Sequence, residues 1–187
     1  MTRVVKIEKT GDPEVLKIEN IEIEQPGPDE ALIETKAIAL NFIDCYHRSG
    51  LYPVKLPSGI GLEASGIIKK VGTKVKDLTV GDHVAYVSSP IGAYAEERVM
   101  PVNKLVKIPK EIGLEVAATI MTKGLTTHYL LHKTYPVKAN DIILYHAAAG
   151  GVGQIFCQWA KSIGCKVIGT VGSDEKISIA KKNGCNL

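Results

Sequence analysis

The sequence predicts two domains, a barrel-like β domain followed by the beginning of a parallel α/β domain. Short apolar runs separated by glycine and proline turns fill residues 4–109, which is the pattern of a small β-barrel. From Gly113 onward the apolar residues recur at helical spacing. A turn of small residues at 146–153 then joins an apolar run to another helical pattern, in the order strand, glycine loop, helix. We expect the first domain to cover residues 1–123 and the second to cover 124–187.

In the first domain, turn residues such as Gly11-Asp12-Pro13 separate the expected strands. The prolines at 53 and 57 exclude a regular helix and predict an ordered loop, and polar and aromatic residues from Asn41 onward crowd into it. The expected strands or turn-and-strand segments lie at 4–7, 16–23, 31–40, 67–72, 80–87, 92–100 and 105–109.

The second domain is expected to alternate helices and buried strands. Its last residues, 183–187, stand where a third strand would begin, and a doubly wound dinucleotide fold needs several more strands. We therefore expect an incomplete cofactor domain. From Gly113 onward the expected elements are a helix at 114–121, a second helix from Thr122 to Tyr135, strands at 142–145 and 166–171, and a helix at 174–182 with Ser173 as its N-cap.

Composition argues against several classes of protein. A hydrophobic content of 45% and a charged content of 23% are ordinary for a globular protein. The net charge is +3 and acids alternate with bases, so no basic patch for nucleic acid is expected. The sequence has no signal-peptide core and no uninterrupted apolar run long enough to cross a membrane, which predicts a cytoplasmic protein. The four scattered cysteines are expected to be reduced thiols that pack in the interior.

The small-residue turn has the spacing of a dinucleotide fingerprint, with Ala147 in place of the first glycine and one additional glycine. Gly150 and Gly151 allow the backbone to approach a ligand closely, and Gly153 allows tight helix–strand packing. The helix that follows directs positive potential at a pyrophosphate. Backbone groups from Ala147 to Gly153, including that of Val152, are therefore candidate cofactor contacts. The alternative is a purely structural turn.

The residues after the second strand of this domain favour NADPH. An NAD site usually presents an acidic residue about twenty positions beyond the loop, where it binds the ribose 2′-hydroxyl. This chain instead has Gly172 and Ser173, followed by Lys176. A hydroxyl and an ammonium group can hold a 2′-phosphate. Ser173 can also cap the next helix, and Lys176 can simply be solvated.

Short motifs spread along almost the whole chain form a specific set. They are Asn41-Phe-Ile-Asp44, Arg48-Ser-Gly-Leu-Tyr52-Pro, Pro57-Ser-Gly59, Gly61-x-Glu63-Ala64, Gly81-Asp82-x-Val84, Gly92-Ala-Tyr94 and His146-Ala-Ala-Ala-Gly-Gly-Val-Gly153. This set resembles the quinone oxidoreductase (ζ-crystallin-like) branch of the medium-chain dehydrogenase/reductases. The resemblance implies a GroES-like β-barrel domain joined to a Rossmann domain, and NADPH:quinone reductase activity on a small-molecule quinone. It also implies a homodimer, whose contact surface is expected to be missing here.

Zinc-dependent members of that superfamily hold their catalytic metal with two cysteines and with the histidine of a Gly-His-Glu motif. This chain has Asn41, Leu62 and Lys123 at the corresponding positions. Leucine cannot ligate Zn²⁺ and lysine rarely does, so no metal site is expected. A quinone is already electrophilic, and hydrogen-bond donors suffice to stabilise its reduced oxygen.

The resemblance also implies roles for individual residues. Asn41 should lie beside the nicotinamide and the substrate carbonyl, Tyr46, Arg48 and Tyr52 should line the pocket, and Thr126 should contact the cofactor. Asn41 could instead stabilise a loop, and either tyrosine ring could simply pack.

Three functions remain open at this point. The first is a zinc-independent, NADPH-dependent quinone reductase, and the second is an NADPH-dependent reductase of the activated C=C bond of an enone. The third is a catalytically incompetent fragment of such an enzyme. For the 187-residue chain alone we expect weak or absent NADPH binding and an exposed apolar sheet edge prone to association.

Overall fold

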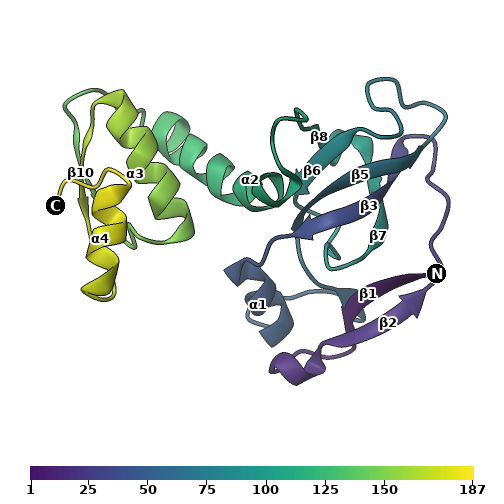
Figure 1. Cartoon of the computed structure of the whole chain (residues 1–187). Helices are drawn as coiled ribbons and strands as arrows, with labels where there is room; N and C mark the ends of the chain where they lie inside the picture. Colours follow the sequence, from purple (N-terminus) through teal and green to yellow (C-terminus); the bar gives the residue numbers. More distant parts are fainter. The chain divides into compact units, whose positions relative to one another are not determined.

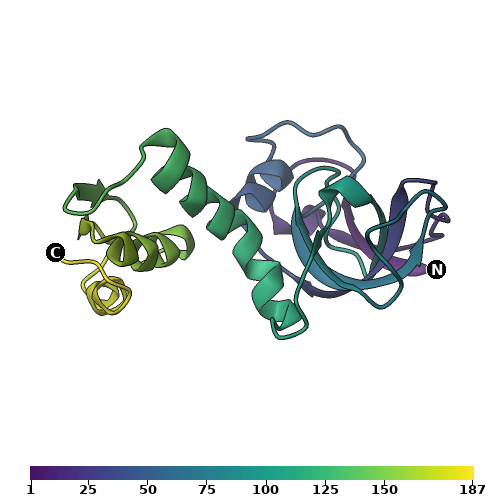
Figure 2. The same cartoon turned by 90° about the horizontal axis from the view of Figure 1, so that it is seen from above.

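The computed structural model covers residues 1–187 and divides into two compact units, Met1–Met121 and Thr122–Leu187 (Figures 1 and 2). The division falls inside helix α2 (Leu114–Tyr129), as does the boundary predicted after Lys123. None of the helices is both long enough and apolar enough to span a membrane.

Two antiparallel sheets build the N-terminal unit. The strands are β1 (Thr2–Ile7), β2 (Lys17–Ile21), β3 (Glu30–Ile38), β4 (Ser58–Gly59), β5 (Glu63–Val71), β6 (His83–Val87), β7 (Glu97–Pro101) and β8 (Val106–Lys107). The smaller sheet has the order β2-β1-β4 and the larger has the order β7-β3-β5-β6-β8. A bridge between Val4 and Ala95 joins β1 to the segment before β7. The barrel-like architecture predicted from the turn spacing is therefore confirmed (Figure 1).

The core of this unit lies between strands of the larger sheet. Ile33, Ile68, Tyr86 and Met100 are almost completely buried, and they come from four neighbouring strands. Gly66 permits one close approach, because a Cβ atom there would lie 2.2 Å from the carbonyl oxygen of Glu34. That contact is next to a register shift between β3 and β5, where the twisted sheet closes on itself.

Helix α1 (Phe42–Ser49) corrects the prediction of a loop that begins at Asn41. Asn41 is the N-cap, and its backbone N–H donates to Asp44 Oδ2 at 2.9 Å. Gly50 ends the helix with a φ of 86°, a conformation that favours glycine. The prolines restrict only the residues that follow, so a short capped helix fits before them. Two 3₁₀ turns, η1 (Pro13–Val15) and η2 (Val102–Lys104), complete the unit.

The prediction of two helices between 114 and 135 is wrong. Residues Leu114–Tyr129 form one continuous helix, α2, which passes into the single π-helical turn η3 (Leu130–Thr134). This segment contains no proline, and Gly124 alone costs only about 1 kcal/mol in a helix. Nothing local therefore breaks the hydrogen-bond ladder. The predicted end of the helix before Tyr135-Pro136 is confirmed.

The C-terminal unit is a parallel α/β arrangement. Strand β9 (Ile142–Tyr145) is followed by α3 (Gly151–Ile163), β10 (Lys166–Gly169) and α4 (Glu175–Lys182), and β9 pairs with β10 in parallel. Phe156, Cys157 and Ala160 on α3 pack with Val167 of β10 in one buried cluster. The predicted strand–loop–helix order is thus confirmed.

Two boundaries in this unit differ from the prediction, and the strand expected at the last residues does not form. Strand β10 ends two residues early, at Gly169, and α4 begins at Glu175 with Asp174 rather than Ser173 as its N-cap. Asp174 already has helical dihedral angles and makes no side-chain cap, so capping chemistry does not fix this end. The last residues run beside β10, where the Gly169 N–H donates to the Leu187 carbonyl at 2.7 Å, but they form no assigned strand.

Candidate functional site

The glycine loop between β9 and α3 is tightly folded. Ala147 has a φ of 56°, and the Gly150 N–H donates to the Ala147 carbonyl oxygen at 2.8 Å. A Cβ atom on Gly153 would lie 2.4 Å from that same oxygen and 2.6 Å from the carbonyl oxygen of Ala148. Only glycine fits at position 153 without movement of the backbone. Ala147 takes a left-handed conformation that a glycine would adopt at lower cost.

The start of α3 can accept an anion. Gly150 is the N-cap and makes no side-chain cap, and the first turn of the helix contains no acidic residue. Gly150 and Gly151 are exposed and Val152 is half-buried. The unpaired N–H groups of a helix start carry a partial positive charge, which suits a phosphate.

The residues expected to recognise the ribose lie at the same edge of the sheet as the glycine loop. The Ala148 N–H donates to the Thr170 carbonyl at 3.0 Å, and His146 Nδ1 lies 2.9 Å from Thr170 Oγ1. These contacts join the carboxyl ends of β9 and β10, the usual ligand edge of a parallel sheet. Gly172, Ser173 and Lys176 follow β10 and are all exposed.

Lys123 also lies near this edge of the sheet, although its sequence position predicted only that a zinc ligand is missing. Lys123 reaches the start of α3, since a Cβ atom on Gly151 would lie 2.8 Å from its Cε. An ammonium group at this position adds positive charge where a pyrophosphate would bind. The sequence could have indicated this role, because it has a lysine where zinc-dependent members of the superfamily have a zinc-ligating cysteine. Thr126 lies one turn further along α2 and is half-buried.

A hydrogen-bonded polar cluster surrounds the start of α1 in the N-terminal unit. Asn41 Nδ2 donates to Glu63 Oε2 at 2.7 Å, and the Tyr94 hydroxyl donates to Asp44 Oδ2 at 3.0 Å. Glu63 is 0% exposed and Asp44 is 2% exposed. The Asn41 amide is therefore held by a buried carboxylate.

Burial raises the pKa of Asp44, although hydrogen bonds from the Asn41 backbone and the Tyr94 hydroxyl oppose this shift. Burial and the neighbouring Asp44 carboxylate raise the pKa of Tyr94. The phenol therefore stays protonated and donates to the carboxylate. Both carboxylates of this cluster serve as hydrogen-bond acceptors.

The structure brings the two predicted tyrosines together. The rings of Tyr46 and Tyr52 have centroids 5.2 Å apart, and the Tyr52 N–H donates to the Tyr46 carbonyl at 3.1 Å. Arg48 lies at the other end of α1 from Asn41, and its carbonyl accepts the Gly11 N–H at 2.9 Å.

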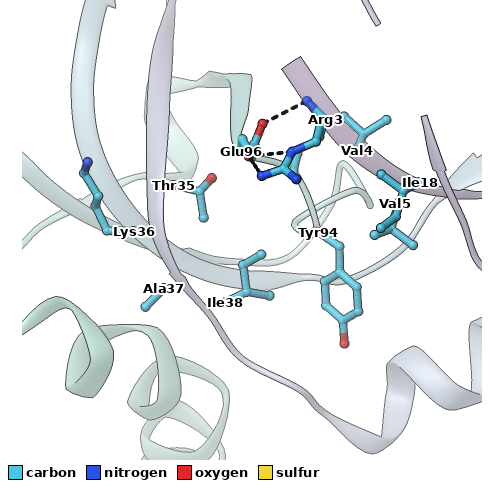
Figure 3. Close-up of a pocket in the computed structure, with 11 residues that line it drawn as sticks. Arg3, Val4, Val5, Ile18, Thr35, Lys36, Ala37, Ile38, Tyr94 and Glu96 are labelled. Atoms are coloured by element: carbon cyan, nitrogen blue, oxygen red, sulfur yellow. Dashed lines mark hydrogen bonds and ion pairs between the residues drawn. The ribbon is translucent and has the colours of Figure 1, made fainter. Parts of the chain in front are cut away.

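A cavity of about 390 Å³ lies between β1, β2 and β3 and contains none of the predicted site residues (Figure 3). Val5, Ile18 and Ile38 supply apolar walls, and the ion pair of Arg3 with Glu96 borders it. Tyr94 also lines this cavity, and its hydroxyl group contacts Asp44 in the polar cluster at α1.

Comparison with known proteins gives consistent matches over both units. A family model described as the alcohol dehydrogenase GroES-like domain matches residues 27–110, and one described as zinc-binding dehydrogenase matches residues 151–187. Quinone oxidoreductase of Pseudomonas aeruginosa is 49% identical over 185 residues, which are 98% of this chain and 57% of that protein. These matches confirm the resemblance to the quinone oxidoreductase branch of the medium-chain dehydrogenase/reductases.

Two further relatives bear on the chemistry of the quinone oxidoreductase family. The crystal structure of Escherichia coli quinone oxidoreductase complexed with NADPH has a TM-score of 0.95 and 48% identity, over 99% of this chain and 57% of that one. A 2-haloacrylate reductase from a Burkholderia species is 42% identical over 192 residues, which are 100% of this chain and 58% of that protein. The chain thus spans somewhat more than half the length of the relatives that it matches.

The two domain matches and the structural similarity confirm the predicted GroES-like and Rossmann-like domains. The functional roles of Asn41, Tyr46, Arg48, Tyr52 and Thr126 stay predictions.

Proposed function

We propose that this chain supports NADPH-dependent, zinc-independent reduction of quinones. The loop between β9 and α3 carries the proposal. Its backbone is packed so closely that a side chain on Gly153 would clash with two carbonyl oxygens, and it presents an exposed helix start without acidic residues. Such a preformed start to a helix suits the pyrophosphate of a dinucleotide.

The charges around this loop support NADPH over NADH. We assign Ser173 and Lys176 to the 2′-phosphate and the backbone of Gly172 to the adjacent ribose. Lys123 would add a cation beside the pyrophosphate, because its side chain reaches Gly151. The NADPH complex of the related E. coli quinone oxidoreductase supports the same choice of cofactor.

The residue types at the superfamily's metal positions support zinc independence. Asn41 donates to Glu63, Leu62 has no donor atom, and Lys123 is a cation that would repel Zn²⁺. The description of the C-terminal family model as zinc-binding refers to the model and not to these side chains.

Bound NADPH would supply the reducing equivalents. As a quinone is reduced, negative charge grows on its carbonyl oxygen, and a fixed hydrogen-bond donor stabilises that charge. We assign this role to Asn41, whose amide is oriented by the buried Glu63. Tyr46 and Tyr52 form a paired aromatic surface that can contact a planar ring, and Arg48 adds positive charge.

Reduction of an activated C=C bond is the second candidate reaction. The related 2-haloacrylate reductase supports it, because its substrate has a C=C bond conjugated to a carboxylate. A donor at Asn41 would serve either substrate, since an enone also gains negative charge on its oxygen.

Four unpaired cysteines, three of them buried, support a reducing compartment, and we propose a cytoplasmic location. The proposed partner is a small-molecule quinone, with no nucleic acid or membrane partner. Homodimer formation stays a prediction that sedimentation can test.

The test begins with titration of the 187-residue chain with NADPH and NADH, followed by nicotinamide fluorescence. We expect NADPH to bind more tightly than NADH. Lys176→Ala should weaken the binding of NADPH roughly tenfold and leave the binding of NADH unchanged. Lys182→Ala, on the last turn of α4, is the matched control. Equal affinities for the two cofactors would contradict the assignment of Ser173 and Lys176.

Turnover then separates the candidate reactions. Faster oxidation of NADPH with a naphthoquinone than with an enone or a haloacrylate supports quinone reduction, and the reverse supports the second candidate. Absence of both binding and turnover would identify the chain as incompetent by itself. Zinc that is lost on substitution of Asn41 would refute zinc independence.

A further inference from the structure

Two histidines lie beside the only tryptophan of the chain, all within the C-terminal unit. His128 is in the last turn of α2 and His132 is in η3, and their ring centroids are 5.1 Å apart. Trp159 on α3 lies 5.9 Å from the His128 ring and 5.2 Å from the His132 ring. Both histidines are exposed and Trp159 is half-buried.

The separation of the two imidazoles matches what a shared metal ion requires. With metal–nitrogen bonds of about 2.1 Å, two imidazoles that meet near the tetrahedral angle have ring centroids about 5 Å apart. Histidines four residues apart on a helix are a known arrangement for one such ion. The observed separation of 5.1 Å is close to this value.

Packing against Trp159 restricts the two rings before any ion arrives. The His132 ring meets the indole edge-on, at 62°, and the His128 ring is tilted by 49°. Side chains already restricted in the free protein lose less entropy when they bind. The indole thus favours chelation by the pair over binding to either histidine alone.

The ligand set defines the class of ion. No third His, Cys, Asp or Glu side chain joins the pair to form a closed site, so water would complete the coordination shell. Two neutral imidazoles with water suit Zn²⁺, Ni²⁺ or Cu²⁺, whereas Mg²⁺ and Ca²⁺ prefer oxygen ligands.

We propose that His128 and His132 form a surface site for a divalent transition-metal ion. This site is separate from the glycine loop and from the residues assigned to quinone reduction. It neither requires nor contradicts the zinc independence of that reaction, because it uses different residues.

The tryptophan is a built-in probe, since Ni²⁺ and Cu²⁺ quench indole fluorescence at short range. We expect added Ni²⁺ to quench Trp159 along a saturable curve. Calorimetry with Zn²⁺ should give one ion per chain. His128→Gln and His132→Gln should each weaken Ni²⁺ binding by roughly a hundredfold, because chelation by two linked ligands is lost.

His146→Gln is the matched control, because His146 is also exposed but lies outside the pair. It should leave quenching by Ni²⁺ unchanged, and Ca²⁺ should not quench the wild-type chain. Circular dichroism checks that each variant is folded. If a variant unfolds, NMR of the wild-type chain decides instead, because Zn²⁺ should shift the ring signals of only two histidines.

Quenching by Ni²⁺ that survives both substitutions would overturn the proposal, as would a wild-type chain without saturable quenching. Metal analysis separates this site from a catalytic one. If the Asn41→Ala variant retains zinc and the His128→Gln variant loses it, the zinc is bound by His128 and His132. The opposite pattern would contradict both this proposal and zinc independence.

Discussion

Replacement of Gly153 by alanine should destabilise the C-terminal unit, whereas the same change at Gly151 should not. A Cβ atom at position 153 would lie 2.4 Å and 2.6 Å from two backbone carbonyl oxygens, which cannot move without distortion of the loop. At position 151 the nearest atom is 2.8 Å away but belongs to the flexible end of Lys123. Both positions are in the first turn of α3, so the gain in helix propensity is similar for the two variants.

The magnitude follows from two opposing effects. Overpacking against fixed neighbours costs about 1–3 kcal/mol, and alanine regains at most about 1 kcal/mol of helix propensity. We expect Gly153→Ala to lower the free energy of unfolding by about 1–2 kcal/mol. Gly151→Ala should stay within roughly 0.5 kcal/mol of wild type.

Urea unfolding followed by the fluorescence of Trp159 measures this difference. The only tryptophan lies in the C-terminal unit, so its signal reports that unit even if the N-terminal unit unfolds separately. With a urea dependence of about 1–2 kcal/mol per molar, the midpoint of Gly153→Ala should fall by roughly 1 M. If Gly153→Ala unfolds at the same urea concentration as Gly151→Ala, the packing argument for the loop is wrong.

Three further predictions concern buried polar groups and thiols. Because burial raises the folded-state pKa of Asp44, its contribution to stability is fully present below the unfolded pKa and is lost as pH rises through the folded pKa. The stability of Asp44→Asn relative to wild type should therefore increase over that pH range, and a difference independent of pH would contradict this. Asn41→Ala removes a hydrogen-bond donor from the buried Glu63 carboxylate and should lower the free energy of unfolding of the N-terminal unit by about 1–3 kcal/mol. Thermal unfolding followed by circular dichroism measures this loss, and an unchanged melting temperature would contradict it. Cys157, Cys165 and Cys185 are buried, and burial raises the pKa of Cys157 to about 11. An aromatic disulfide reagent should therefore react rapidly only with the half-buried Cys45, and a fast phase that persists in Cys45→Ser would refute this.

The C-terminal elements could be predicted because their signals are local. The predicted strand at 142–145 coincides with β9, since an apolar run next to a glycine loop can form only a few structures. The predicted start of α4 is one residue early, because neither Ser173 nor Asp174 makes a side-chain cap that would fix this end. The prediction of two helices in place of α2 is wrong because a change in apolar period does not end a helix when no residue interrupts its backbone hydrogen bonds.

The polar cluster at α1 could not be assembled from the sequence. Asn41 and Glu63 are 22 residues apart, and Tyr94 is 50 residues from Asp44. Only the pairing of β5 in the sheet and the chain path before β7 bring these groups to one place. The sequence did offer a local signal for α1 itself, since Asn41 and Asp44 have the spacing of a capping interaction and Gly50 follows as a helix terminator.

The two-stranded sheet of the C-terminal unit limits what its glycine loop can do in this chain. Side chains alternate along a strand, so one face of β9 and β10 packs on α3 while the other presents Ile142 and Leu144, which are 67% and 60% exposed. Parallel sheets normally have both faces covered. The packing that fixes Gly153 lies on the covered face, so the loop can keep its shape while the strands that carry it are held from one side only. Affinity for NADPH therefore tests whether the sheet holds the loop well enough to bind the cofactor, whereas unfolding of Gly153→Ala tests how tightly the loop itself is packed. The two experiments thus separate the presence of a cofactor loop from its ability to bind the cofactor.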